Sequence, residues 1–406
     1  MPVGLPDIPE LMPVEGIRLS AFRAGLYKKN RKDLALIACD HETAFAAVFT
    51  RNAFCAAPVR VARLHLKSGN PALCIINAGN ANAGTGQQGY QDALTICHAT
   101  ADIQGCTPEA ILPFSTGVIG EPLPVNKICN VLPDLFDALS ENAWLDMARA
   151  IMTTDTVPKG ISRIVNIDGK SVTITGVVKG AGMIRPDMAT MLAFIATDAT
   201  VDKSLLQSLL EEAVEMSFNR VSVDGDTSTN DACVLMATGK SSAAPVTRDK
   251  KNAVGLFRQA LEEVCLYLAQ ALVRDGEGVT KFVTLDIRGG RDREECLSVA
   301  EAIAHSPLVK TALYASDPNW GRILAAIGRS PVKELDVSRV DIFLHNVCIV
   351  RNGERDAEYT EAQGRKVFAG DEITVSVHLH RGDYSLSFWT SDLSYEYVRI
   401  NAEYRS

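Results

Sequence analysis

The stretch Lys179-Gly-Ala-Gly-Met-Ile-Arg-Pro-Asp-Met-Ala-Thr-Met-Leu-Ala-Phe-Ile-Ala-Thr-Asp198 joins two segments of opposite character. In its first half, Gly180 and Gly182 permit backbone conformations closed to other residues, and Pro186 biases the residue before it away from helix. In its second half, the apolar run from Met191 to Ala196 is typical of a buried strand. The stretch therefore predicts a flexible loop that leads into a rigid strand.

Ala189 and Thr190 stand at the junction between this loop and this strand. The position suits a chain that cuts itself, because the Thr190 hydroxyl would attack the Ala189 carbonyl, whose small side chain leaves room. Hydrolysis would give Thr190 a free α-amine, and its unperturbed pKa of roughly 7.7–8.0 suits it to activate the neighbouring hydroxyl. Spacing alone favours the simpler interpretation, in which Thr190 caps a core strand, and leaves self-cleavage as the alternative.

Two short motifs, Lys179-Gly-Ala-Gly-Met183 and Ala189-Thr-Met-Leu192, closely resemble the cleavage segment of the ornithine acetyltransferase family. The members of this family are the glutamate N-acetyltransferases of arginine biosynthesis. The resemblance changes the interpretation of Thr190 from a capping residue to a nucleophile. It covers almost the whole chain, because other family-like segments are Asn77–Gly84, Ser115–Gly117, Thr153–Thr156, Asp224–Asp231, Asp275–Gly278, Asp317–Arg322 and Asn401–Ser406.

The resemblance also implies roles for individual residues. Cleavage is expected between Ala189 and Thr190, and Thr116 and Gly117 are expected to stabilise the anionic intermediate. A glycine turn such as Ser115-Thr-Gly117 can bring amide groups together as an oxyanion hole requires, although by itself that signal is weak. Ser406 keeps the hydroxyl of the threonine that we associate more often with the family. The implied substrate-binding residues are Thr153, Lys179, Thr190, Glu277, Asn401 and Ser406.

The fold implied by the resemblance is α/β, with a layered α/β/β/α-type architecture and paired mixed sheets, autoprocessed at an internal threonine. Self-cleavage would give an N-terminal chain of residues 1–189 and a C-terminal chain of residues 190–406 that starts with the nucleophile. The implied reaction is a ping-pong transfer of acetyl from N-acetylornithine to glutamate through acetyl-Thr190. Two cleaved chain pairs are expected to associate, as an α2β2 assembly.

Two other classes of protein are carried as alternatives. In an N-terminal-nucleophile amidohydrolase of N-acyl amino acids, water would take the acyl group instead of glutamate. A non-enzymatic ligand-binding protein would use the Gly/Asn-rich loop at 79–89, and its chain would stay uncut. We expect no cofactor, and the sequence leaves open whether acetyl-CoA is a second acetyl donor.

Composition limits the partners of the 406-residue chain. A net charge of −8 argues against non-specific binding to nucleic acid or anionic membranes, and no apolar run approaches the roughly 18 residues that suggest a membrane span. Ten scattered cysteines and an N-terminus without a signal-peptide pattern predict a reducing cytoplasm. The oxygen-rich segment Asp224–Asp231 lacks the glycine and glutamate of an EF-hand, so no metal is expected.

Local patterns predict several elements directly. Strands at 33–39 and 43–50 should be joined by a tight polar turn, and 162–175 should form a hairpin with Asp168-Gly169 as its turn. Helices are expected at about 126–139 and 140–152, with Ser140 as the N-cap of the second. Two further helices are expected at 202–218 and at about 250–273.

Overall fold

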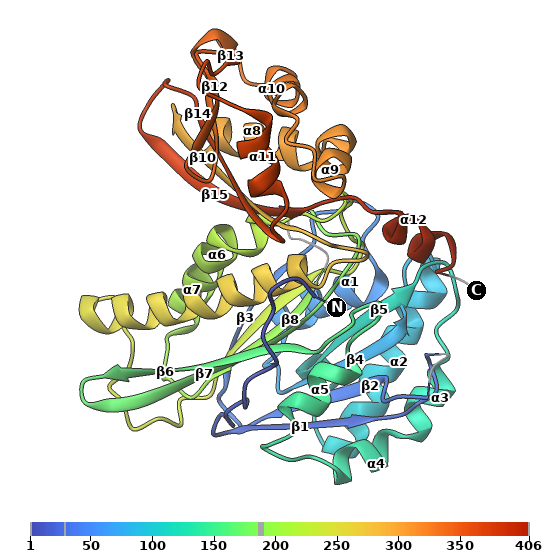
Figure 1. Ribbon diagram of the computed structural model, residues 1–406. Coiled ribbons are helices and arrows are strands. Elements are labelled where there is room, and N and C mark those ends of the chain that lie inside the picture. The colour runs from blue at the N-terminus through green and yellow to red at the C-terminus, as the bar shows by residue number, and fades with distance from the viewer. Residues whose placement is uncertain (1, 28–29, 186–190, 405–406) are drawn as a thin grey trace.

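The computed structural model describes residues 2–27, 30–185 and 191–404. Two mixed β-sheets face each other through a shared apolar core, and helices cover their outer faces (Figure 1). A third mixed sheet with its own helices forms a lobe at one end of this four-layer body. The predicted α/β fold with mixed sheets is therefore confirmed.

The first sheet has four strands in the order β1-β2-β4-β5. β4 and β5 are parallel, because helix α2 carries the chain back between them, and the other neighbours are antiparallel. Apolar residues of α1–α4 cover its outer face. Its elements are β1 Ile17–Phe22, β2 Leu34–Cys39, β4 Leu73–Asn80, β5 Ile111–Val118, α1 Ala57–Ser68, α2 Gly86–Gln104, α3 Val125–Asn130, α4 Leu132–Asp137 and a 3₁₀ turn at Pro108–Ala110.

The second sheet has five strands in the order β3-β9-β8-β7-β6. Only β8 and β9 are parallel, and α6 and α7 pack on the outer face. The predicted hairpin is β6–β7, and its turn residues Asp168 and Gly169 have φ values of 50° and 81°. The elements are β3 Ala44–Phe49, β6 Lys159–Ile167, β7 Lys170–Lys179, β8 Leu192–Thr197, β9 Ala232–Ala237, α6 Lys203–Met216, α7 Lys251–Arg274 and a 3₁₀ turn at Phe218–Arg220.

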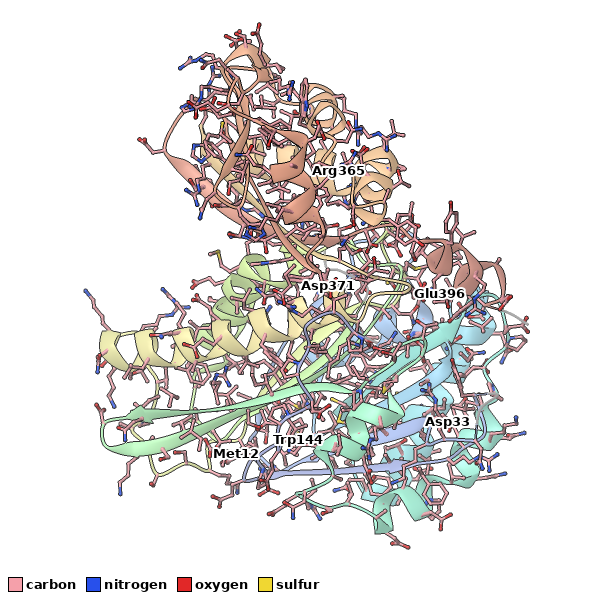
Figure 2. The ribbon with its side chains drawn as sticks, viewed as in Figure 1. Met12, Asp33, Trp144, Arg365, Asp371 and Glu396 are labelled. Atoms are coloured by element: carbon pink, nitrogen blue, oxygen red, sulfur yellow. The ribbon has the colours of Figure 1, made fainter. Side chains whose placement is uncertain are left out.

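Aromatic side chains fill the space between the two facing sheets. Phe114 of β5 meets Phe194 of β8 edge to face, with ring centroids 5.1 Å apart and an interplanar angle of 85°. Trp144, from helix α5 (Trp144–Ala150), closes the same core and is fully buried (Figure 2). Burial of such rings contributes about 25 cal/mol per Å² of apolar surface, so this layer is a principal source of stability.

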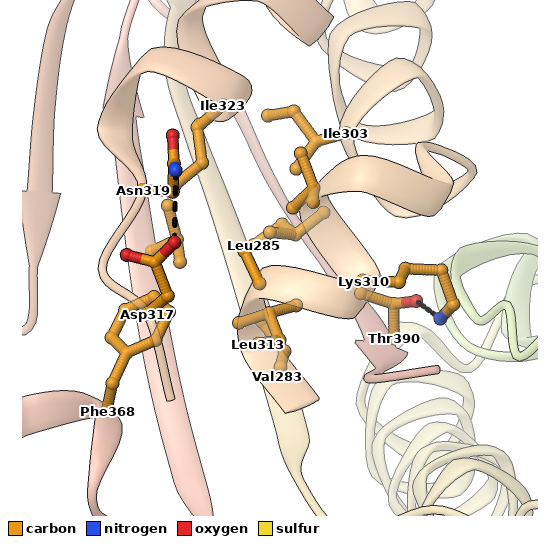
Figure 3. A pocket seen from close by; sticks show the side chains of 13 residues that line it. Val283, Leu285, Ile303, Lys310, Leu313, Asp317, Asn319, Ile323, Phe368 and Thr390 are labelled. Carbon is orange, nitrogen blue, oxygen red and sulfur yellow. Dashed lines mark hydrogen bonds between the residues drawn. The ribbon is translucent and has the colours of Figure 1, made fainter. Parts of the chain in front are cut away.

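The C-terminal lobe is built on a six-stranded sheet in the order β13-β12-β11-β14-β10-β15, in which only β10 and β14 are parallel. It encloses a small, largely apolar cavity of about 10 Å³, with room for about one water (Figure 3). Lys310 donates to Thr390 at one side of this cavity, over 3.4 Å. The elements are β10 Phe282–Gly290, β11 Asp341–Leu344, β12 Val347–Arg351, β13 Glu354–Arg355, β14 Glu372–His378, β15 Tyr384–Ser391, α8 Arg293–Ala304, α9 Pro307–Tyr314, α10 Trp320–Gly328, α11 Glu361–Phe368 and a 3₁₀ turn at Val337–Arg339.

The predicted tight polar turn at 40–42 is confirmed: the Thr43 N–H donates to the Asp40 carbonyl over 3.3 Å, and the turn carries the chain from β2 in one sheet to β3 in the other. Two other local expectations need correction. The helix expected at 126–139 is instead two short helices, which are separated at Val131. Pro133, in the first turn of α4, has no backbone N–H and cannot make the hydrogen bond that would join the two helices. Ser140 is no N-cap, because its backbone exchanges two 2.9 Å hydrogen bonds with Leu19 of β1 and α5 begins later.

Two observations bear on the setting of the protein. Among the helices that the structure describes, none is long and apolar enough to cross a membrane. All ten cysteines lie in the described residues and all are free thiols, as the scattered spacing predicted.

Phe194→Ala should lower the free energy of unfolding by about 3–5 kcal/mol, because it removes a fully buried ring from the core between the sheets. Urea unfolding followed by circular dichroism measures the loss. Ile164→Ala, at an exposed position in β6, is the control and should change the value by less than about 0.5 kcal/mol. Equal losses in the two variants would contradict a stability centred between the facing sheets.

Candidate active site

One polar cavity of about 260 Å³ opens where the two facing sheets end beside the C-terminal helix α12 (Tyr395–Ala402). Strands β5 and β7 reach it with their last residues, and several loops and α12 complete its wall. The lining residues are Ala81, Thr116, Gly117, Val118, Ile119, Thr153, Thr154, Lys179, Gly182, Met183, Ser228, Thr229, Asn230, Glu277, Asn401 and Tyr404.

The end of β5 places a hydroxyl next to an ammonium group. The Lys179 Nζ donates to Thr116 Oγ1 over 3.1 Å, so the last residue of β7 meets the end of β5 across the two sheets. Gly117 follows with φ of 133°, and a Cβ there would lie 2.3 Å from the backbone carbon of Gly79 in β4. Glycine is therefore required for this turn, which brings the chain close to the neighbouring strand.

A carboxylate lies in the same cavity, on the turn after α7. The Glu277 N–H donates to the Ala181 carbonyl over 2.8 Å, and the Asn401 side-chain amide of α12 donates to Glu277 Oε2, also over 2.8 Å. Gly278 has φ of 67°, and a Cβ there would lie 2.4 Å from the Tyr397 nitrogen of α12. Because Gly278 has no side chain, the turn that carries Glu277 packs directly against α12.

The segment after α5 forms another wall of the cavity. Thr153 is buried, its N–H donates to Asp155 Oδ2 over 2.9 Å, and its carbonyl accepts from the Tyr27 hydroxyl, also over 2.9 Å. A side chain of its own segment and one from the loop after β1 therefore fix its backbone.

Burial shifts the pKa values of a basic and an acidic group at the cavity in opposite directions. Burial lowers the pKa of Lys179, because desolvation penalises its ammonium form, and the nearby carboxylate of Asp155 offsets only part of that effect. Burial raises the pKa of Asp231 well above its usual range. Asp231 Oδ1 accepts the Met191 N–H over 3.0 Å, one residue before β8.

All of the predicted site residues that the structure describes line this one cavity: Thr116, Gly117, Thr153, Lys179, Glu277 and Asn401. Their convergence is a property of the fold, and their individual roles stay predictions. Ala189, Thr190 and Ser406 lie outside the described residues.

Asn230 and Tyr404 are among the cavity residues that were not singled out from the sequence. Asn230 donates to the Ala81 carbonyl over 2.6 Å and to the Ser115 carbonyl over 3.0 Å, and so ties the second sheet to the turn that carries Thr116. Tyr404 lies three residues beyond Asn401, and burial raises the pKa of its hydroxyl to about 12. Both belong to segments that resemble the family, which was the signal available for finding them.

The Asp224–Asp231 segment is a hydrogen-bonded loop. Asp224 accepts the N–H groups of Met183 and Ile184 over 2.6 and 2.9 Å, and it also accepts from the Tyr397 hydroxyl over 3.2 Å. Within residues 2–27, 30–185 and 191–404, no three His, Cys, Asp or Glu side chains come together to hold a metal.

A hydroxyl, an ammonium group and a carboxylate that converge on one small cavity between mixed sheets define a class: an α/β enzyme suited to a small, charged, amino-acid-like substrate. Opposite charges on the wall can hold an ammonium and a carboxylate of one molecule in a fixed orientation.

Comparison with known proteins identifies the family. A family model described as the ArgJ family matches residues 18–406. The arginine biosynthesis bifunctional protein ArgJ of Pseudomonas fluorescens (strain Pf0-1) is 53% identical over 406 residues, which is 100% of both chains. The ArgJ protein of Methylococcus capsulatus is 54% identical over 402 residues, which is 99% of this chain and 98% of that one. The chain belongs to the ArgJ family, and it is an acetyltransferase of arginine biosynthesis, as the sequence predicted.

Solved structures of the same family are also similar. ArgJ from Bacillus halodurans is 38% identical, with a TM-score of 0.49 over 52% of this chain and 98% of that chain. The ornithine acetyltransferase from Mycobacterium tuberculosis, solved in complex with ornithine, is 29% identical, with a TM-score of 0.38 over 43% of this chain and 92% of that chain.

Gly182→Ala should lower kcat/KM for acetyl transfer by roughly tenfold to a hundredfold. The new Cβ would lie 2.5 Å from the carboxyl carbon of Glu277, so that side chain must leave its place beside Asn401. Initial rates with both amino-acid substrates measure the effect.

Gly255→Ala is the matched control, because Gly255 lies within α7 and no atom lies within 4 Å of the new Cβ. It should leave kcat/KM unchanged and stabilise the protein by about 0.5–1 kcal/mol. A Gly182→Ala enzyme as active as this control would show that the position of Glu277 does not matter for transfer.

Proposed function

We propose that the chain cleaves itself between Ala189 and Thr190 and then transfers acetyl from N-acetylornithine to glutamate through an acetyl ester on Thr190. The observation that carries the proposal is the convergence of Thr116, Lys179 and Glu277 on one cavity. Family membership supports the same reaction, because relatives 53% and 54% identical are named as arginine biosynthesis bifunctional proteins.

Opposite charges in the cavity support amino-acid substrates. The Lys179 ammonium suits the α-carboxylate that N-acetylornithine and glutamate share, and the Glu277 carboxylate suits an amine. Thr153 and Asn401 complete the binding wall in this proposal, together with Ser406. Because both substrates use the same groups in turn, one site serves both halves of a ping-pong reaction.

In the first half-reaction, the Thr190 Oγ attacks the acetyl carbonyl of N-acetylornithine while the Thr190 α-amine takes the hydroxyl proton. The bond between the carbonyl carbon and the nitrogen breaks, the nitrogen receives the proton, and ornithine leaves. In the second half-reaction, the glutamate α-amine attacks the ester, and the oxygen that leaves recovers its proton. Acetyl-CoA, as a second donor, would form the same ester with release of the thiol.

Charge develops on the carbonyl oxygen in each half-reaction. We assign Thr116 and Gly117 to stabilise it, and the hydrogen bond from Lys179 Nζ to the Thr116 hydroxyl supports the assignment. A lysine that polarises this hydroxyl makes it a stronger donor to an oxyanion. No cofactor enters these steps.

The second sheet contains strands from both sides of the predicted cleavage point in the chain, which supports continued association of the two products. β7 and β8 lie on either side of that point in the chain and are antiparallel neighbours, and β3 pairs with β9. Residues 1–189 and 190–406 therefore share one sheet and one core. Exposed apolar side chains on α9 and α12, Leu308, Tyr395 and Val398, support pairing of two such units as α2β2.

Ten free thiols support a reducing, cytoplasmic setting for this reaction.

Purified wild-type protein should give two masses under denaturing conditions, for residues 1–189 and 190–406, and one particle in native size-exclusion chromatography. Thr190→Ala removes the nucleophile and should give one uncut chain. Intact mass spectrometry measures both. A Thr190→Ala chain that is still cut at this bond would rule out self-cleavage by Thr190.

Incubation with N-acetylornithine alone should add about 42 daltons, one acetyl group, to the C-terminal fragment only. Added glutamate should discharge the ester as N-acetylglutamate, whereas an amidohydrolase would release acetate with or without glutamate. Thr116→Ala should slow formation of the ester by about 10²–10³ if the side-chain hydroxyl donates to the oxyanion. Turnover without any adduct would replace this mechanism by direct transfer in a ternary complex.

A further inference from the structure

Lys159, the first residue of β6, is a buried cation to which the proposed reaction gives no task. Its ammonium lies 2.6 Å from Asp155 Oδ1 and 2.5 Å from Asp275 Oδ2, and its side chain has no exposed surface. The two carboxylates are equally buried and come from segments far apart in the chain. One ammonium group therefore compensates two buried anions.

Each of these carboxylates holds the backbone of a segment that lines the cavity. Asp155 accepts the Thr153 N–H over 2.9 Å and the Gly180 N–H, next to Lys179, over 2.7 Å. Asp275 accepts the Thr156 N–H over 3.0 Å and stands two residues before Glu277. Three cavity segments therefore meet at one cation: the one after α5, the end of β7 and the turn after α7.

The charges of this network depend on one another. Burial opposes ionisation of Asp155, but the Lys159 and Lys179 ammonium groups outweigh it and hold the pKa of Asp155 below its usual range. Burial also disfavours the Lys159 cation, and the Asp155 and Asp275 carboxylates outweigh that effect and raise its pKa. Removal of the cation would leave Asp275 without the Lys159 ammonium and Asp155 with the Lys179 ammonium alone, and their hydrogen bonds to the backbone would weaken or rearrange.

Lys159 also acts on the cavity through its field. After burial and the opposing attraction of Asp155, its positive charge is the next influence that lowers the pKa of Lys179. Lys179 is charged below its pKa and loses its charge as the pH rises through that value. Removal of Lys159 should therefore raise the pKa of Lys179 and extend its charged form to higher pH.

We propose that Lys159 is a positioning residue for acetyl transfer, which fixes the places of Thr153, Lys179 and Glu277 through Asp155 and Asp275. Lys159 does not line the cavity, so it acts on the substrate only through these residues. The proposal rests on the proposed function for the identity of the substrates, whereas the network itself is independent of it. A merely structural ion pair would affect folding and leave the kinetic constants of the folded enzyme unchanged.

The test compares Lys159→Met with Lys159→Arg and with the control Lys240→Met, which removes an exposed lysine paired with Asp40. Lys159→Met should raise KM for N-acetylornithine and glutamate at least tenfold, and should slow ester formation at saturating donor by a smaller factor, because Lys179 also polarises the Thr116 hydroxyl. In a plot of KM against pH, the rise of KM at high pH should move to higher pH in Lys159→Met. It should stay in place in Lys159→Arg, because arginine keeps the positive charge. Lys240→Met should match the wild type.

Two results would overturn the proposal: a lower melting temperature with unchanged KM and pH profile, or the same shift of the rise of KM at high pH in both Lys159 variants. If Lys159→Met is insoluble, Asp275→Asn takes its place, and an unchanged KM in that variant would equally overturn it. If the wild type transfers no acetyl group, the proposed function fails separately. In that case, calorimetric titration with ornithine tests the positioning role of Lys159. We expect the variant to bind ornithine at least tenfold more weakly than the wild type, and equal binding would overturn the proposal.

Discussion

The antiparallel pairing of β7 with β8 is the constraint on which the candidate active site depends. Lys179, the last residue of β7, lies opposite Leu192, the first residue of β8, so both ends of the segment between them are fixed in one sheet. β9 runs parallel to β8 and brings Asn230 and Asp231 to the same edge. The facing sheet adds Thr116 from β5, which meets Lys179 directly. A strand pairing thus determines where a hydroxyl and an ammonium group come together, and it fixes Lys179 and Leu192, which stand on either side of the predicted cleavage point in the chain.

Much of the local structure could be predicted because its causes are local. The Asp168-Gly169 pair adopts the positive φ values that a two-residue hairpin needs, and the apolar run after Met191 is the fully buried strand β8. Asp202 caps α6 through its own side chain. The family-like motifs went further, because six residues spread from Thr116 to Asn401 line one cavity that no periodicity in the sequence could have assembled.

What could not be predicted depends on contacts between distant segments. The turn at 40–42 looks like a hairpin turn, but whether its two strands pair is decided by β4 and β9, which occupy their edges. In the sequence Val157-Pro-Lys-Gly160, a lysine beside a proline and a glycine has the pattern of a solvent-exposed loop. Lys159 is buried only because Asp155 and Asp275 meet in the folded chain, and that meeting leaves no trace in the local pattern.

The pairing of β3 with β9 has a consequence for the order of events during synthesis. Ala44 lies opposite Ala237, so β3 emerges from the ribosome long before the strand that will cover its edge. The five-stranded sheet can close only after residue 237 has been made, by which time the peptide bond between Ala189 and Thr190 already lies within a continuous nascent chain. Under the proposed self-cleavage, folding is therefore the task of the intact polypeptide, and in the meantime β3 presents unpaired backbone groups that a chaperone can shield.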